Sequence, residues 1–214
     1  MTEILLPPPE LPADLGSVPI VRDPQKMLAQ TLEGWNPRED LWVFGYGSLI
    51  WRPEIEFVER RLAAVHGYHR ALRMWSRINR GSPLCPGLVF ALMSGGACKG
   101  VVYRVPRERA RAEFDVLWHR EMPTGVYDAK WLPCKTGEGT VRALAFTLSR
   151  NSPNYTGELA DSQMLTILGD ACGRYGTTLD YVQRTHQGLR EQGISDRKIA
   201  EVLAFAREHS LING

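Results

Sequence analysis

Residues 42–51 read WVFGYGSLIW, an apolar strand that runs directly into a turn of Gly, Tyr, Gly and Ser. Gly45 and Gly47 are free to take positive φ and to let a ligand approach the main chain, while the flanking apolar residues anchor the turn in a core. Backbone N–H groups in such a turn bind small anionic groups. The alternative interpretation is a tight turn after a buried strand, because glycine-rich turns are common.

Composition predicts one soluble domain. The chain has 214 residues, of which 43% are hydrophobic, enough for one core of ordinary size. Lys and Arg number 26 against 24 Asp and Glu, so a net charge of +2 creates no global field for nucleic acid or membranes. No apolar run has the length of a membrane span, and no signal peptide is recognisable, so we expect a cytoplasmic protein.

Cysteine and histidine spacing favours structural roles over metal binding. The cysteines form no C-x-x-C pair, which predicts buried, reduced thiols and leaves a cysteine nucleophile with weak support. They are Cys85, Cys98, Cys134 and Cys172. His66 and His69 have no carboxylate motif nearby, so we expect no metal site.

The chain divides into a proline-rich arm with a short helix at residues 1–40 and a compact domain at 41–214. Residues 1–24 hold six of the fourteen prolines, which favours an extended arm. Asp23 is placed to cap a helix that has Pro24 at its first position and ends near Gly34.

Strand patterns come first in the compact domain and helices come last, which predicts an α+β fold with a closed or partly closed mixed β-barrel flanked by helices. The expected strands are 41–46, 60–66, 68–75, 87–93, 99–105, 127–134 and 140–148. One helix begins after Pro106 and carries Ala110, Phe114, Leu117 and Trp118 on one face, and the others span 157–172, 177–191 and 196–207.

The WVFGYGSLIW stretch resembles the substrate loop of the ChaC branch of the γ-glutamylcyclotransferases. Further segments resemble that branch in the same order, over about residues 41–205: Arg80-Gly81, Pro86-Gly87-Leu88, residues 95–100, His119-Arg120-Glu121-Met122 and Trp131-Leu132-Pro133. The resemblance implies a γ-glutamylcyclotransferase-like fold. It also implies degradation of reduced glutathione to 5-oxoproline and Cys-Gly, with no metal or organic cofactor.

Glu121 is the candidate catalytic residue. It follows an amphipathic stretch and precedes the helix breaker Met122-Pro123, so it should lie at the end of an element. Apolar neighbours would raise its pKa, and Arg120 would oppose that rise. An ordinary ion pair with Arg120 is the alternative. The resemblance implies that Glu121 is the proton acceptor.

By the same resemblance, the γ-glutamyl pocket is lined through main-chain amides and the Ser48 hydroxyl. The residues concerned are Val43, Phe44, Gly45, Tyr46, Gly47, Ser48 and Leu49. Tyr127 and Tyr155 match tyrosines near the pocket, where their phenols would hydrogen-bond the substrate and orient Glu121. Half-buried packing with a hydrated hydroxyl is the alternative for both.

Residues 70–80 carry four arginines around Trp75. Alternation places Leu72, Met74 and Ser76 on one face of a strand, with Arg73, Trp75 and Arg77 on the other. Arg73 is a candidate for binding the glycine carboxylate of glutathione. The alternative is a nucleic-acid face, which the small net charge disfavours.

Two further functional hypotheses stay open. The same cyclisation could act on other γ-glutamyl amines or dipeptides, since the loop reads only their shared half. A non-catalytic module that binds γ-glutamyl metabolites is the alternative from another class.

Overall fold

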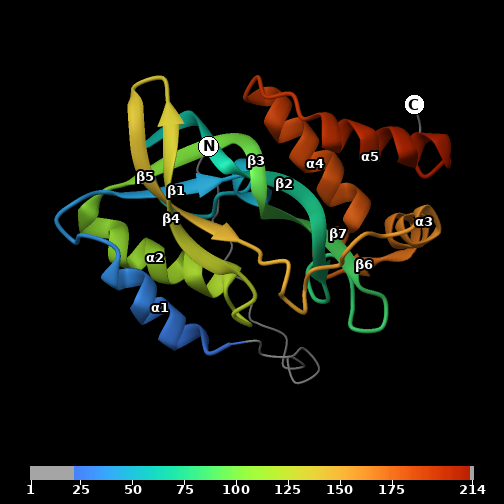
Figure 1. The fold of residues 1–214 in the computed structure, drawn as a ribbon, viewed down its shortest axis with the longest axis horizontal. Coiled ribbons are helices and arrows are strands. Elements are labelled where there is room, and N and C mark those ends of the chain that lie inside the picture. Colours follow the sequence, from blue (N-terminus) through green and yellow to red (C-terminus); the bar gives the residue numbers. More distant parts are fainter. Residues whose placement is uncertain (1–21, 213–214) are drawn as a thin grey trace, which may run out of the picture.

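A closed five-stranded barrel forms the centre of the structure, a computed structural model that describes residues 22–212. The strand order is β1-β3-β2-β4-β5, and β5 closes the barrel through parallel pairing with β1 and β3. The strands are β1 (Leu41–Gly45), β2 (Glu59–Ser76), β3 (Gly87–Val105), β4 (Asp128–Thr136) and β5 (Gly139–Thr147). With the helices packed around it, this barrel confirms the α+β prediction (Figure 1).

β2 and β3 form one long antiparallel hairpin, so the prediction of four shorter strands between residues 60 and 105 was wrong. Residues 67 and 94–98, left between the predicted strands, instead form an irregularity inside the hairpin, where the register shifts between His66 and Tyr68. Gly67 has φ 81°, and Gly95 and Gly96 opposite it have φ 101° and 73°. Positive φ at glycine allows a bulge without ending the ladder.

The helices gather on two sides of the barrel (Figure 1). α1 (Pro24–Glu33) and α2 (Arg107–Glu121) lie together beneath it, and α3 (Asp161–Asp170), α4 (Thr178–Glu191) and α5 (Arg197–Glu208) lie on the other side. The remaining elements are the 3-10 turn η2 (Ser48–Ile50) and the strand pair β6 (Cys172–Gly173) with β7 (Gly176–Thr177). The site lies where β1, α2 and α4 meet η2, as described below.

The predictions for α1 and α2, the two helices beneath the barrel, are confirmed. The Asp23 carboxylate accepts hydrogen bonds from the amides of Gln25 and Lys26, and Gly34 ends α1. α2 buries the predicted apolar face and ends at Glu121, with Met122 as its C-cap. Glu121 is therefore held at the end of a helix whose other face is fixed in the core.

The segment before α3 departs from its prediction. α3 starts at Asp161 instead of near residue 157, because the preceding residues hydrogen-bond to β2. The Trp75 amide donates to the Asn154 carbonyl at 3.0 Å, and the Thr156 amide donates to the Arg73 carbonyl at 3.0 Å. Main-chain groups committed to a strand edge are unavailable to a helix.

The proline-rich part of the predicted arm, residues 1–21, lies outside the described residues. α1 packs on the barrel side: the Trp118 indole donates to the Pro24 carbonyl at 2.9 Å, and the Trp131 indole donates to the Thr31 carbonyl at 3.1 Å. The domain boundary near residue 41 stays a prediction. Within residues 22–212, no helix combines the length and apolarity that crossing a bilayer requires.

Candidate active site

The loop after β1 presents a row of unused main-chain donors. Across the described part of the chain, the amides of residues 46–49 donate to no protein acceptor, whereas several of the loop's carbonyls are engaged. The Tyr103 hydroxyl donates to the Leu49 carbonyl at 2.7 Å, and the Arg52 amide donates to the Ser48 carbonyl at 2.8 Å. Consecutive free amides form a site for an anionic oxygen.

The glycines of this loop are required for space and not for positive φ, so the sequence prediction on this point was wrong. Gly47 has φ −123°, and Gly45 also lies outside the left-handed region. A Cβ on Gly47 would lie 2.9 Å from the Tyr181 hydroxyl oxygen, and a Cβ on Gly45 would lie 3.1 Å from the Leu49 Cβ. A side chain at either position would crowd the loop against its neighbours.

The side chains of the predicted pocket residues divide between core and site. Val43, Phe44 and Leu49 are buried in the hydrophobic core, and Val43 and Phe44 lie in the paired strand β1, so of these three only Leu49 belongs to the row of unused amides. Ser48 is partly exposed, and its hydroxyl oxygen accepts a hydrogen bond from Arg120 at 3.0 Å. That bond leaves the Ser48 proton available as a donor.

Arg120 joins the loop to Glu121. Its Nε lies 3.0 Å from Glu121 Oε1, and the two side chains are 18% and 15% exposed. The remaining donors of its guanidinium bind Ser48, the carbonyls of Arg52 and Pro53, and the Glu54 carboxylate. The arginine therefore fixes the distance between the amide row and the carboxylate.

Burial raises the pKa of Glu121, and the structure decides a balance that the sequence left open. The positive charge of Arg120 and its hydrogen bond oppose the rise, while the negative charge of Glu54 adds to it. A carboxylate whose pKa is raised toward neutrality is a stronger base than an exposed one and is still able to return the proton. The geometry suits general acid–base chemistry on a ligand held by the loop.

Three buried tyrosines surround this carboxylate. Tyr46, Tyr127 and Tyr181 are 6%, 7% and 4% exposed, and the negative charge of Glu121 contributes to raising the pKa of each phenol, after the larger contribution of burial. The Tyr46 hydroxyl donates to the Phe146 carbonyl at 2.8 Å. The phenols therefore remain neutral and polar around Glu121 at physiological pH.

Arg73 and Tyr155 make their contacts with other segments. The predicted alternation along β2 is confirmed, because Leu72, Met74 and Ser76 are buried while Arg73 is on the opposite face. Arg73 donates to the Gly157 carbonyl at 2.8 Å and pairs with Glu158. The Tyr155 main chain bridges to Met74, and in residues 22–212 no hydrogen bond joins its phenol to Glu121 or to the loop.

Sequence reasoning missed Arg70 and Tyr181. Arg70 is buried and donates from Nε to the Tyr46 carbonyl, from one terminal nitrogen to the Lys99 carbonyl at 2.6 Å, and from the other to Asp196. Alternation offered a signal, since Arg70 shares the buried face of β2 with Leu72. Tyr181 offered none, because an aromatic residue on the apolar face of a helix is typical of core.

The cysteine prediction needs one correction. All four cysteines are free, and Cys98 and Cys134 are buried, but Cys85 is only half-buried and Cys172 is exposed because it lies in the short surface strand β6. In the described ranges, no group of three or more His, Cys, Asp or Glu could hold a metal ion.

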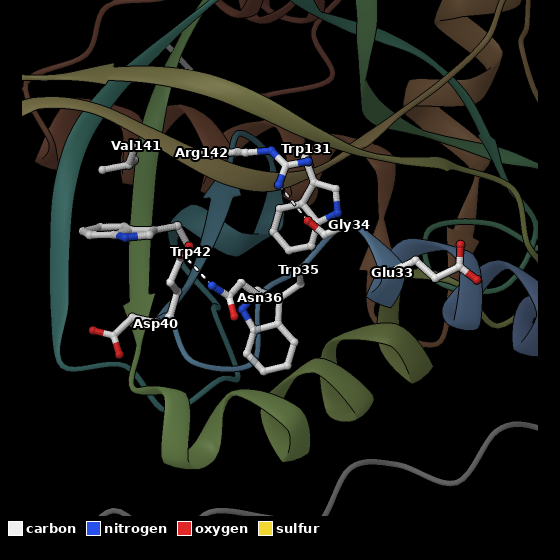
Figure 2. Close-up of a pocket in the computed structure, with 10 residues that line it drawn as sticks. Glu33, Gly34, Trp35, Asn36, Asp40, Trp42, Trp131, Val141 and Arg142 are labelled. Atoms are coloured by element: carbon white, nitrogen blue, oxygen red, sulfur yellow. Dashed lines mark hydrogen bonds between the residues drawn. The ribbon is translucent and has the colours of Figure 1, made fainter.

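A separate hollow of about 580 Å³ lies between the end of α1 and the hairpin of β4 and β5 (Figure 2). Its lining includes Trp35, Trp42 and Trp131, and Arg142 crosses it to donate to the Gly34 carbonyl at 2.7 Å. Asn36 in turn donates to Glu39 at 2.9 Å. Neither Glu121 nor the loop at residues 46–49 lines this hollow.

Comparison with known proteins identifies the family of this chain. Residues 41–209 match the family model described as ChaC-like protein. The glutathione-specific gamma-glutamylcyclotransferase of Escherichia coli is 34% identical over 85% of this chain and 79% of its own length, and the human glutathione-specific gamma-glutamylcyclotransferase 1 is 33% identical over 69% and 71%.

A solved structure shares the fold. The gamma-glutamyl cyclotransferase specific to glutathione from yeast superposes with a TM-score of 0.72 at 21% identity, covering 79% of this chain and 96% of the yeast chain. The likeness of fold is consistent with the family match over residues 41–209. This chain belongs to the ChaC-like protein family.

Proposed function

We propose that this protein is a glutathione-specific γ-glutamylcyclotransferase, which cleaves reduced glutathione into 5-oxoproline and Cys-Gly. The observation that carries the proposal is the bridge of Arg120 between Ser48 and Glu121, which holds a row of free amides beside a buried carboxylate of raised pKa. Relatives that bear the name of this activity cover most of the chain.

The reaction needs a base and a shaped pocket. The α-amine of the γ-glutamyl group attacks its own γ-carbonyl carbon, a C–N bond closes a five-membered ring, and the C–N bond to cysteine breaks. An α-amine has a pKa of about 8, so it must lose a proton before attack. Glu121 accepts that proton and returns it to the departing nitrogen, so no water is consumed.

The loop supplies the positioning. Free amides at residues 46–49 and the Ser48 hydroxyl are suited to bind the α-carboxylate or the carbonyl oxygen of the γ-glutamyl group. Holding the amine against the carbonyl carbon contributes strongly, since well-oriented ring closure is worth up to about 7–11 kcal/mol. The proposed binding set includes Tyr127 and Tyr155, whose phenols would hydrogen-bond the substrate, and Arg73 at the glycine end of glutathione.

A cytoplasmic location, with no nucleic-acid or membrane partner, completes the proposal. The four free cysteines support a reducing compartment, where structural disulfides are rare.

The decisive experiment is mass spectrometry of the purified full chain incubated with reduced glutathione, scored for 5-oxoproline and Cys-Gly. Glu121→Gln keeps the shape of the side chain and removes the base, so kcat should fall by about 10²- to 10⁴-fold. Glu108→Gln is the matched control on the same helix: its carboxylate pairs with Arg107 at the surface, and turnover should equal that of the wild type.

The outcomes separate the alternatives. A Glu121→Gln variant as active as the wild type would show that another group is the base. Wild-type turnover of other γ-glutamyl amines but not of glutathione would reassign the substrate. Binding of γ-glutamyl compounds with no product from any of them would favour a non-catalytic module.

A further inference from the structure

Packing and one hydrogen bond hold the Tyr181 side chain in place. It lies on α4, with its ring centroid 5.4 Å from that of Phe90 and 5.3 Å from the guanidinium carbon of Arg80. Its hydroxyl oxygen accepts a hydrogen bond from the Phe90 amide at 3.2 Å. A buried phenol held by packing and by one hydrogen bond has a defined direction for its own proton.

That proton has no acceptor among residues 22–212. A phenol has one donor and accepts through its oxygen, so the bond from Phe90 leaves the donor unused. An unused donor on a side chain that is 4% exposed is costly unless a ligand or water accepts from it.

The hydroxyl faces the substrate loop. A Cβ on Gly47 would lie 2.9 Å from the Tyr181 oxygen, so the phenol oxygen lies directly beside this glycine. Gly47 belongs to the row of amides at residues 46–49 that donate to no acceptor among the described residues. Glu121 is close enough for its charge to help raise the pKa of the phenol to about 12, after burial, so the phenol stays protonated at neutral pH.

We propose that Tyr181 is a substrate-binding residue whose hydroxyl donates to an oxygen of the γ-glutamyl group beside Gly47. This inference rests on the proposed function, because it names one more contact in the same site. The chemistry that fits is a carboxylate or carbonyl oxygen that carries negative charge, since the loop amides, the Ser48 hydroxyl and the Tyr181 phenol each offer an unused donor.

Steady-state kinetics of Tyr181→Phe tests the assignment. The substitution keeps the ring and removes the donor, and loss of a hydrogen bond to a charged oxygen should lower kcat/KM about tenfold or more. A rise in KM alone identifies an oxygen charged in the ground state, the α-carboxylate. A fall in kcat alone identifies the γ-carbonyl oxygen, which gains charge during attack.

A second variant guards against a folding defect. Gly47→Ala keeps the Tyr181 hydroxyl and places a methyl group 2.9 Å from it, so it should lower kcat/KM without removing the bond to Phe90. Tyr68→Phe is the matched control, because that phenol accepts a hydrogen bond from Lys130 at 3.4 Å and kinetics should not change. Thermal unfolding midpoints of all variants show whether each remains folded.

An active wild type with unchanged kcat and KM in folded Tyr181→Phe would overturn the inference and leave the proposed function intact. A wild type that forms no 5-oxoproline from any γ-glutamyl compound would overturn both.

Discussion

Arg70 and Arg120 contact the loop at residues 46–49 from different elements, and they differ in what surrounds their charge. The Arg70 side chain is 2% exposed, and its donors are taken by two main-chain carbonyls and Asp196, the N-cap residue of α5. Arg120 is 18% exposed and faces Glu121 and Ser48. Arg70, whose donors are used within the protein, maintains the shape of the loop. Arg120 contacts the loop as well, and its charge also acts on Glu121, the base.

Removing the contact of Arg70 with the loop should cause the largest loss of folding stability. Arg70→Met leaves Asp196 without its partner and two carbonyls without donors, so the free energy of unfolding should fall by about 3–5 kcal/mol. Urea denaturation measures it. Because Arg70 holds the Tyr46 carbonyl, activity should fall with stability.

Arg73→Met is the matched control, with the same substitution on the same strand. Glu158, the partner of Arg73, is 85% exposed, and an exposed pair contributes at most about 1 kcal/mol. Equal losses of unfolding free energy in Arg70→Met and Arg73→Met would contradict this prediction. They would show that the burial of Arg70 adds no stability beyond that of an exposed arginine.

The contact of Arg120 with Glu121 should be visible in the pH dependence of kcat/KM. Burial raises the pKa of Glu121 and Arg120 opposes the rise, so Arg120→Met should raise the pKa further. The base works in its ionised form, so kcat/KM falls as pH drops through that pKa. The acid limb of the pH profile should therefore move to higher pH in this variant.

Glu54→Gln should shift the pKa of Glu121 in the opposite direction. The charge of Glu54 raises the pKa of Glu121, so its removal should move the acid limb to lower pH. Opposite shifts in the two variants identify Glu121 as the titrating base. Shifts in the same direction, with normal thermal unfolding, would assign the limb to another group.

The smallest expected effect concerns the glycine end of glutathione. If Arg73 exchanges Glu158 for the substrate carboxylate, Arg73→Met should raise KM for glutathione by at most about fivefold, the equivalent of ~1 kcal/mol. KM for a γ-glutamyl amine that lacks this carboxylate should not change. An unchanged KM for glutathione would remove Arg73 from the binding set.

The parts of the fold predicted correctly depend on local chemistry. Asp23, Pro24 and Gly34 mark the bounds of α1 because capping and φ restrictions act within a few residues. The apolar spacing of α2 places Glu121 at its end for the same reason. Where Gly67 meets Gly95 and Gly96, local signals favoured breaks, but pairing across the hairpin continues through the irregularity.

The sequence by itself determined the bounds of α1, the end of α2, the alternation along β2, the glycine turn after β1 and, through its resemblance, the family. Only the tertiary structure decided which donors of the site are already used. Arg70 reaches Asp196 across 126 positions of the chain, and Tyr181 reaches Phe90 across 91. Hydrogen-bond saturation depends on which distant groups burial brings together, and no local pattern encodes that.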